Sequence, residues 1–309
     1  MHDLGGRIAE VAGLKHALPY LRLFQGATFV VKLSGEALEE GPALARFLEQ
    51  VELLARLGLK LVLVHGGGPQ TNALSARLGL PVTKIDGRRV TDAATLEAAV
   101  AATAGLANTA LLDACRRSGL KAVGLTGVDA SLVTARRRPP VVAANGERVD
   151  YGFVGDVVAV DRRPLDRLLE AGYVPVVAPL AADESGGVLN VNADTIAAEV
   201  AVALGAAKLL IGLGVAGLLE RVEDPHSLVP LVDLAGLAEL EARGALAGGM
   251  LPKARAIERA LAGGVARVHL IPFAAPDALL IELFTNEGIG TMVVADRAAG
   301  APAPLEATP

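Results

Sequence analysis

Two lysines and an aspartate stand at places in the sequence where phosphoryl-transfer sites are commonly built. Lys32 follows a short apolar run, and Asp194 and Lys253 each stand where a stretch with helical spacing of apolar residues begins. Ligands of open α/β sheets bind where parallel strands end, which is where Lys32 falls. A phosphoryl group in transfer spreads negative charge over its oxygens, so fixed cations and backbone N–H groups stabilise it. Each lysine alone reads as an ordinary surface residue, but with the acid and the nearby glycines they predict a phosphoryl-transfer site.

Three consecutive glycines, Gly66 to Gly68, supply the second half of such a site. They follow the apolar run 61–64 and His65, and a helical pattern begins near Asn72. Because these residues have no Cβ, their N–H groups can converge on an anion, and a helix N-terminus adds partial positive charge. The alternative is a tight strand-to-helix turn, and His65 is interpreted as a structural hydrogen-bonding residue. Neither a G-x-x-x-x-G-K-[ST] run nor a G-x-G-x-x-G run occurs, so phosphate binding would use another scaffold.

Short apolar runs alternate with helical patterns along the chain, and these elements must position the chemistry. Stretches such as 43–57 and 194–204 have apolar residues at helical spacing. This alternation indicates a mostly parallel sheet covered by helices on both faces. The predicted fold class is therefore α/β, a three-layer αβα sandwich with a mostly parallel central sheet. The expected strands are 29–31, 61–64, 122–125, 174–177, 209–212 and 268–271.

Changes in this pattern divide the chain into four expected regions. Short segments around Asn145-Gly146, a strong hairpin signal, interrupt the alternation between residues 130 and 157. We therefore expect a β-hairpin inside the first half of the chain and a boundary near residues 179–187. The C-terminal residues are rich in Ala and Pro, which is typical of a disordered end. The expected regions are a helical arm at 1–26, a first lobe with the hairpin at 27–180, a second lobe at 181–297 and a disordered tail at 298–309.

The composition argues against several classes of function. The 309 residues carry a net charge of -5 and a pI of about 5.6, so the basic face of a nucleic-acid-binding protein is not expected. The mean hydropathy is +0.46, but the longest uncharged run, 61–76, is shorter than the about 20 residues that span a bilayer. The N-terminus lacks the apolar segment of a secretory signal. The one cysteine, Cys115, permits no internal disulfide, so a cytoplasmic location is expected.

Five blocks of the sequence resemble, in order, the motifs of N-acetyl-L-glutamate kinases of the amino acid kinase family. The resemblance extends from about residue 14 to about residue 293. It implies the amino acid kinase fold and a reaction in which ATP phosphorylates N-acetyl-L-glutamate, with Mg²⁺ carried by the nucleotide and held by no protein side chain. It also implies that lobe 27–180 binds the acceptor and lobe 181–297 binds Mg-ATP. The blocks are Val31-Lys32-Leu33-Ser34-Gly35, His65-Gly66-Gly67-Gly68-Pro69, Asp86-Gly87-Arg88-Arg89-Val90-Thr91, Asn190-Val191-Asn192-Ala193-Asp194 and Gly248-Gly249-Met250-Leu251-Pro252-Lys253.

The same resemblance implies roles for individual residues. Lys32 and Lys253 would stabilise the transferring phosphoryl group, and Asp194 would hold both ammonium groups. Arg89 would bind an acceptor carboxylate with its planar fork. The other residues implied in acceptor binding are Gly35, Gly66, Gly67, Asn190 and Asn192, and those implied in nucleotide binding are Ser34, Gly212, Leu213, Gly217 and Met250. Independently of the resemblance, a γ-carboxylate with a pKa of about 4.3 is already ionised at neutral pH, so this reaction requires no general base.

Two departures from the family pattern leave other functions open. Ser34 replaces the first of a pair of glycines, and Gly212 and Leu213 stand where relatives have the threonine and aspartate of Thr-Asp-Val-x-Gly-Val. A run without a hydroxyl or carboxylate predicts weak ATP binding or an altered nucleotide preference. One alternative is a kinase for another amino-blocked acidic amino acid, such as an aminoadipate derivative. The other is a catalytically weak arginine-sensing or partner-binding protein, against which the retained lysines and aspartate argue.

The two ends of the chain resemble those of arginine-inhibited relatives. Apolar residues recur at helical spacing in 14–22, which predicts a helix with a face to bury. In those relatives such helices interlace, so the resemblance implies a homohexamer, a trimer of dimers, that is inhibited by L-arginine. The alternative is that the arm packs on its own subunit. The residues implied in arginine binding are Tyr20, His269, Glu282 and Gly290, with Glu282 as the partner of the guanidinium group.

Overall fold

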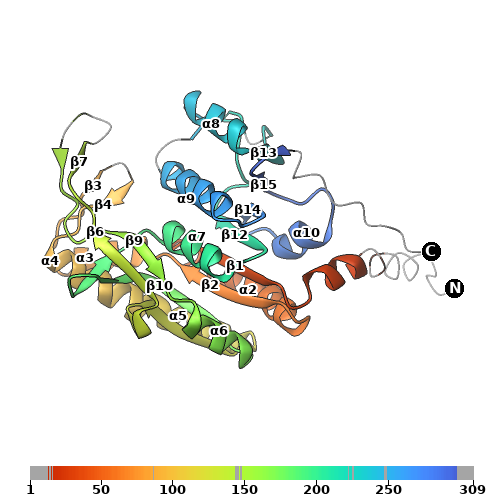
Figure 1. Ribbon diagram of the computed structural model, residues 1–309, viewed down its shortest axis with the longest axis horizontal. Helices are drawn as coiled ribbons and strands as arrows, with labels where there is room; N and C mark the ends of the chain where they lie inside the picture. Colours follow the sequence, from red (N-terminus) through yellow and green to blue (C-terminus); the bar gives the residue numbers. More distant parts are fainter. Residues whose placement is uncertain are drawn as a thin grey trace.

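The computed structural model describes residues 13, 15, 17–85, 87–142, 146, 148–221, 223–224, 226–246 and 249–297. The predictions for the first twelve residues of the arm, for the turn residue Asn145 and for the tail 298–309 lie outside these residues. Asp86 and Gly248 of the family motifs also lie outside them. In the described part, helices surround one large sheet (Figure 1).

The central sheet has eleven strands, most of them parallel to their neighbours. They are β1 (Thr28–Leu33), β2 (Lys60–His65), β5 (Ala122–Gly127), β6 (Val133–Arg137), β9 (Gly155–Val160), β10 (Val174–Asp183), β11 (Val188–Asn190), β12 (Lys208–Leu213), β13 (Leu231–Asp233), β14 (Arg267–Pro272) and β15 (Thr291–Val294). Their order is β13-β15-β14-β12-β1-β2-β10-β6-β9, and β5 and β11 also pair with β10. Among the described pairs of this sheet, β6–β9, β10–β11 and β14–β15 are antiparallel and the others are parallel. The predicted mostly parallel α/β sheet is confirmed.

Helices cover both faces of the sheet and create two separate hydrophobic cores. Successive residues of a strand point to opposite faces, so Val30 of β1 belongs to one core while Phe29 and Val31 belong to the other. Each of these side chains is fully buried, which stabilises the fold by about 1.5–3 kcal/mol. The first core is covered by α6 (Arg163–Glu170), α7 (Ala193–Leu204), α8 (Leu234–Ala242) and α9 (Met250–Ala262), and the second by α2 (Gly41–Arg56), α5 (Asn108–Arg117) and α10 (Ala278–Phe284). The three-layer αβα sandwich is thereby confirmed.

A long helical run from residue 93 to residue 117 changes its winding in the middle. It consists of α4 (Ala93–Val100), the π-helix η1 (Ala101–Ala107) and α5. By length and hydropathy alone this run could cross a membrane, but half of its most apolar window is buried inside the fold. Because α5 packs against β5 and β10, the run is a core element of the sandwich.

Two small hairpins lie beside one end of the main sheet (Figure 1). In one, β3 (Lys84–Ile85) pairs with β4 (Arg88–Arg89), and in the other β7 (Val141–Val142) pairs with β8 (Arg148–Val149). The hydroxyl of Tyr151 donates a hydrogen bond to the carbonyl of Ile85 at 3.2 Å, which ties the two hairpins together. The main sheet continues through both 27–180 and 181–297, so the division into two functional lobes at these bounds stays a prediction.

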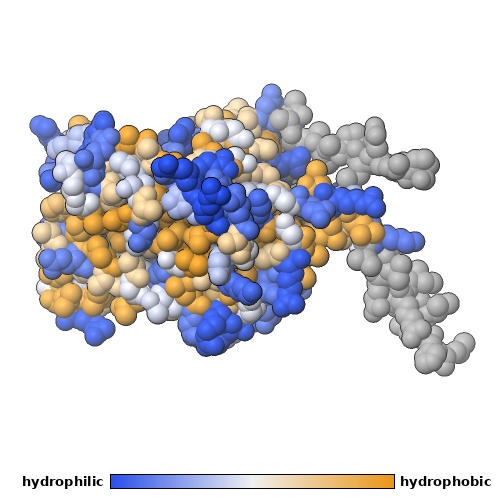
Figure 2. Space-filling view, turned by 60° about the horizontal axis from the view of Figure 1, so that its bottom comes forward, coloured by the Kyte–Doolittle hydropathy of each residue, from blue (hydrophilic) through white to orange (hydrophobic). Residues whose placement is uncertain are grey.

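The described part of the N-terminal arm is helical from residue 17 to residue 24 and leads away from the sandwich near α10 (Figure 1). The ring of Tyr20 packs against those of Phe24 and Phe284, with centroids 6.2 and 6.4 Å apart. Leu18 and Leu23 of the same helix are 41% and 67% exposed. Figure 2 shows further hydrophobic patches between hydrophilic residues on the face that it presents. The described part of the arm therefore packs on its own subunit through Tyr20 and leaves two leucines exposed.

Candidate active site

Lys32, Asp194 and Lys253 come together in the structure. Nζ of Lys32 lies 2.8 Å from Oδ1 of Asp194, and Nζ of Lys253 lies 3.1 Å from each oxygen of the same carboxylate. Lys32 stands near the end of β1, Asp194 in the first turn of α7 and Lys253 in the first turn of α9. All three are buried, at 5%, 6% and 8% exposure. The three residues, far apart in the sequence, therefore form one cluster that carries a net positive charge.

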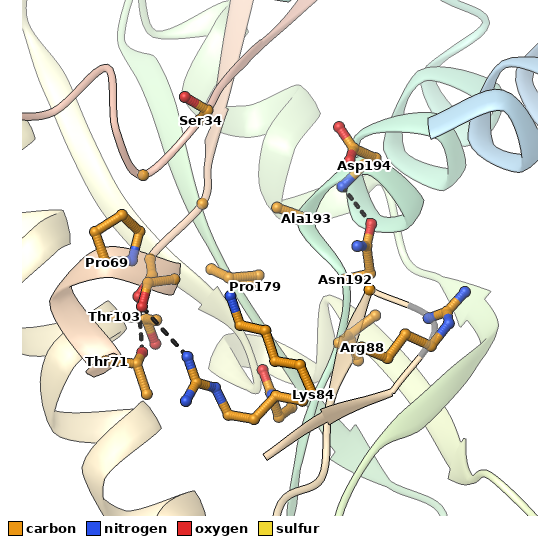
Figure 3. A pocket seen from close by; sticks show the side chains of 18 of the residues that line it. Ser34, Pro69, Thr71, Lys84, Arg88, Thr103, Pro179, Asn192, Ala193 and Asp194 are labelled. Atoms are coloured by element: carbon orange, nitrogen blue, oxygen red, sulfur yellow. Dashed lines mark hydrogen bonds between the residues drawn. The ribbon is translucent and has the colours of Figure 1, made fainter. Parts of the chain in front are cut away.

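The position of Asp194 is fixed by the way α7 begins. The side-chain Oδ1 of Asn192 caps this helix, because it accepts hydrogen bonds from the N–H groups of Asp194 at 2.9 Å and Thr195 at 3.2 Å. The carboxylate thus lies at the positive end of the helix dipole as well as next to two ammonium groups. Figure 3 shows Asn192 and Asp194 joined in this way at the edge of the cavity.

The electrostatics of the cluster favour an anionic ligand. Burial by itself raises the pKa of Asp194, but the nearby Lys32 and Lys253 outweigh it, so its pKa is lowered and the group is ionised. Burial, and then the charge of Lys32, lower the pKa of Lys253. Two buried ammonium groups share one carboxylate, and a second anion beside them would relieve the repulsion between them. This is the charge pattern that a phosphoryl group requires.

A cavity of about 220 Å³ opens on the Lys32 side of the cluster (Figure 3). It is lined by the predicted residues Lys32, Ser34, Gly35, Gly66, Gly67, Arg89, Asn190, Asn192 and Asp194, together with Glu36, Lys84, Arg88, Thr71 and Thr103, among others. The sequence interpretation missed Lys84, although it stands just before the Asp86–Thr91 block. In Figure 3 its side chain reaches across the cavity toward Pro179. We call this the acceptor cavity.

Arg89 is held so that part of its guanidinium group remains available. Its Nη2 donates hydrogen bonds to the carbonyl of Gly68 at 3.3 Å and to the side chain of Asn72. Its Nη1 is buried and has no hydrogen-bond partner in the described part of the chain. Burial lowers the pKa of Arg89. A carboxylate in the acceptor cavity would give this nitrogen a partner, and a buried donor without one is costly.

The glycine loop approaches the same cavity between β2 and α3 (Gly68–Arg77). The N–H of Gly66 donates to the carbonyl of Leu33 at 2.8 Å, whereas the N–H of Gly67 has no hydrogen-bond partner in the part of the chain that the structure describes. A Cβ on Gly35 would lie 2.6 Å from Cδ of Pro69, so only glycine fits against the loop at that position. Backbone and helix N-terminus are therefore placed close to where the two lysines meet.

A second cavity of about 200 Å³ lies on the Lys253 side of the cluster. It is lined by Ser34, Glu36, Ala37, Glu40, Gly212, Leu213, Gly214, Lys253 and Phe273. Of the five residues predicted to bind nucleotide, Ser34, Gly212 and Leu213 line it, whereas Gly217 and Met250 do not. Gly217 packs instead beside Thr291, whose Oγ1 would lie 2.6 Å from a Cβ there. We call this the nucleotide-side cavity.

The two departures in the sequence have different consequences here. Ser34 does not adopt a positive φ, so a serine in place of glycine causes no backbone strain at this position. Its hydroxyl accepts a hydrogen bond from the N–H of Ala37 at 3.2 Å. Val215 and Gly217 match the Val-x-Gly of the family pattern, which places its threonine and aspartate at Leu213 and Gly214, one residue later than the sequence interpretation had them. Neither residue offers a polar side chain to the nucleotide-side cavity.

A third cavity, of about 500 Å³, gathers the four residues implied in arginine binding. Tyr20, His269, Glu282 and Gly290 all line it, and Lys208 and Arg267, which the sequence interpretation missed, line it too. These residues come from the arm, β12, β14, α10 and the loop before β15. We call it the regulatory cavity, after the role proposed for it below.

Glu282 is the centre of a buried hydrogen-bond network in the regulatory cavity. Its Oε1 lies 2.6 Å from Nδ1 of His269, and its Oε2 accepts from the N–H groups of Ile289 and Gly290 at 2.8 and 3.1 Å. Nε2 of His269 lies 2.8 Å from Nζ of Lys208. Burial lowers the pKa of His269 to about 4 and that of Lys208 to about 8. At neutral pH the histidine is therefore neutral and links a cation to a carboxylate.

Comparison with known proteins agrees with this geometry. Residues 27–272 match the model of the amino acid kinase family. An acetylglutamate kinase from Myxococcus xanthus is 50% identical over 93% of this chain and 95% of its own length. One from Symbiobacterium thermophilum is 44% identical over 92% of this chain and 97% of its own length.

Solved structures show the same architecture. An N-acetylglutamate synthase from Neisseria gonorrhoeae, solved with coenzyme A and N-acetyl-glutamate, is 30% identical, has a TM-score of 0.79 and is similar over 93% of this chain. The present chain spans 63% of that protein. A carbamate kinase from Giardia lamblia bound to AMP-PNP, 17% identical with a TM-score of 0.63 over 88% of this chain and 99% of its own, shares the fold.

Proposed function

This chain belongs to the amino acid kinase family, is similar to acetylglutamate kinases over nearly all of its length, and, we propose, transfers the γ-phosphoryl group of ATP to the γ-carboxylate of N-acetyl-L-glutamate. The observation that carries the proposal is the position of the charged cluster. Lys32 lines the acceptor cavity, Lys253 lines the nucleotide-side cavity, and Asp194 joins the two ammonium groups. Each cavity therefore has one ammonium group in its lining, and the two groups meet at the same carboxylate.

The reaction needs charge neutralisation and no proton transfer. An oxygen of the ionised γ-carboxylate forms a bond to the γ-phosphorus, and the bond from that phosphorus to the β,γ-bridging oxygen breaks, which yields an acyl phosphate and ADP. Lys32 and Lys253 would neutralise the charge on the transferring oxygens, and the free N–H of Gly67 would donate to one of them. Mg²⁺ carried by the nucleotide supplies further neutralisation of the phosphates. Asp194 would keep both ammonium groups in place throughout.

Acceptor binding would depend on the unpaired nitrogen of Arg89. Its Nη1 would donate to the α-carboxylate, while Asn190 and Asn192 would contact the remaining polar groups from the opposite wall of the acceptor cavity. Asn190 is itself anchored, because its Nδ2 donates to the hydroxyl of Thr91 at 3.3 Å. An aminoadipate derivative, one methylene longer, is the alternative acceptor of the same class.

The regulatory cavity would bind L-arginine. Glu282 would pair with the guanidinium group, and Lys208 or Arg267 would pair with the carboxylate of the ligand. Because Tyr20 of the arm lines this cavity, a ligand bound there would contact the helix that leads away from the subunit and could change its orientation. We propose feedback inhibition of a cytoplasmic homohexamer, in which the arms join dimers.

One assay series separates the candidates. ADP release is measured with N-acetyl-L-glutamate, L-glutamate and N-acetyl-aminoadipate as acceptors, each with and without millimolar L-arginine. The proposal predicts turnover with N-acetyl-L-glutamate, little with free glutamate, and loss of turnover on addition of arginine. Faster turnover with the aminoadipate derivative would favour the alternative acceptor. Arginine binding in calorimetry without turnover of any acceptor would favour the sensing protein.

A further inference from the structure

A buried histidine contacts the glycine loop from behind the acceptor cavity. His65, the last residue of β2, is 0% exposed. Its Nδ1 lies 2.8 Å from the carbonyl oxygen of Gly66, and its Nε2 lies 3.1 Å from Nδ2 of Asn108. Both ring nitrogens are thus engaged, and His65 is not among the residues that line the acceptor cavity.

The partners of the ring determine where its proton is. An amide NH₂ group can only donate, so Nε2 of His65 accepts from Asn108 and the ring proton is on Nδ1. Nδ2 of Asn108 also lies 3.4 Å from the carbonyl of Val176, which supports this orientation of its amide. Nδ1–H of His65 therefore donates to the carbonyl of Gly66. Burial lowers the pKa of His65, which keeps the ring neutral.

This hydrogen bond sets the direction of the peptide between Gly66 and Gly67. The peptide is trans, so its carbonyl and its N–H point to opposite sides. With the carbonyl directed at the buried ring, the N–H of Gly67 faces away from His65, on the side of the cavity that Gly67 lines. This N–H has no hydrogen-bond partner among the described residues. It is therefore free to donate to a ligand.

The π-helix η1 lets one helical run contact both the glycine loop, through Thr103, and the histidine behind it, through Asn108. Thr103 and Asn108 are five residues apart, which in an α-helix would put them about 140° apart around the axis. The i→i+5 pattern of a π-helix brings residues five apart to nearly the same side. Thr103 packs against Gly67, so closely that a Cβ on that glycine would meet its methyl group. Asn108 in turn fills the space left by the missing side chain of Gly124.

We propose that His65 and Asn108 are positioning residues for phosphoryl transfer, which hold the Gly67 N–H toward the transferring group by fixing the Gly66 carbonyl behind it. Neither side chain touches the substrates; both act through the peptide. The expected effect on kcat rests on the proposed kinase activity. The orientation of the peptide between Gly66 and Gly67 does not, because it is a property of the protein without substrates.

Paired substitutions of His65 test the proposal. The amide nitrogen of an asparagine can take the place of Nδ1, whereas that of a glutamine takes the place of Nε2. His65→Asn should therefore keep the bond to Gly66 and retain kcat within about fivefold, while His65→Gln should lose about 10- to 100-fold in kcat with little change in either KM. Asn108→Leu keeps the bond from Nδ1 to Gly66 but leaves Nε2 of the ring without its partner, so its kcat should fall less than that of His65→Gln. Cys115→Ala, a buried change on α5 in the same helical run, is the control for loss of packing alone.

A second measurement needs no activity. In protein labelled with ¹³C-carbonyl and ¹⁵N glycine, only consecutive glycines give carbonyl-coupled amide signals, so the Gly67 amide can be followed. Its chemical shift should move in His65→Gln and stay close to the wild type in His65→Asn. A wild-type kcat in folded His65→Gln, or a His65→Asn variant no better than His65→Gln in both measurements, overturns the proposal. If the wild type phosphorylates no acceptor, the kinase proposal fails. The chemical shifts of the Gly67 amide then decide by themselves whether His65 orients the peptide.

Discussion

Replacement of Lys253 by methionine should separate catalysis from stability in this protein. Methionine keeps most of the apolar stem and removes the ammonium group, which lies 3.1 Å from both oxygens of Asp194. The carboxylate would still have Lys32 at 2.8 Å, so one cation and one anion would remain and no buried charge would be left unpaired. Because burial and Lys32 lower the pKa of Lys253, its charged form is disfavoured in the fold. We therefore expect no loss of thermal stability.

The effect on turnover should be large. Loss of one preorganised group that stabilises the transition state lowers kcat by about 10²–10³, or about 3–4 kcal/mol. Asp194→Asn is the informative contrast, because it removes the carboxylate that both buried ammonium groups contact in the described part of the chain, a change expected to destabilise the fold by about 3–5 kcal/mol. Coupled ADP-release assays and calorimetric unfolding of the wild type and both variants make the comparison. If Lys253→Met kept kcat within tenfold of the wild type, or unfolded as readily as Asp194→Asn, the assignment of the cluster would be wrong.

Four further outcomes follow from the other contacts. Arg89→Lys should raise the acceptor KM by more than about tenfold with little change in the ATP KM, because the planar fork is lost while the charge is kept; equal changes in both would contradict the carboxylate role. The double change Leu213→Thr, Gly214→Asp should tighten ATP binding in calorimetry, and an unchanged Kd would mean that other groups already satisfy the nucleotide. Burial lowers the pKa of His269 from 6.5 to about 4, so the unfolded chain binds more protons than the folded chain between these pH values. The free energy of unfolding should therefore fall by up to about 3 kcal/mol as the pH drops from 6.5 to 4. Denaturation curves of His269→Gln should lack this pH-dependent fall in stability. Deletion of residues 1–26 should leave a dimer that turns over and no longer responds to arginine, whereas a truncated hexamer in light scattering would refute the role of the arm.

The sequence predicts those parts of the site that depend on the ends of single elements. Lys32 could be placed because the apolar run before it reads as a strand, and the ends of parallel strands meet at one edge of the sheet. The glycine triplet and the helix after it could be recognised for the same local reason. The three-layer fold follows from the alternation of apolar strands with helical patterns, which the eleven-stranded sheet confirms.

Features that depend on contacts between distant elements could not be predicted in this way. Lys84 enters the acceptor cavity because a short hairpin folds over it, and its sequence context shows only a lysine in a polar loop. Lys208 is the first residue of β12 and is buried beside His269 only because β12 and β14 pair in register. The π-helix η1 lies in a run of alanines with no distinctive pattern, although it decides which residues face the glycine loop.

Strand β12 joins the regulatory cavity to the nucleotide-side cavity, and its geometry limits how the two cavities could communicate. Lys208 lines the first cavity at one end of β12, and Leu213 lines the second at the other end, about 16 Å away at about 3.3 Å per residue. The strand between them is fully buried and pairs in register with β1 and β14. A close-packed strand of this kind does not shorten or bend to carry a signal. The other element that joins the regulatory cavity to the rest of the molecule is the arm, because Tyr20 lines that cavity from a helix that leads away from the sandwich. Inhibition by a ligand bound there would therefore act by reorienting whole subunits, and it would require the oligomer.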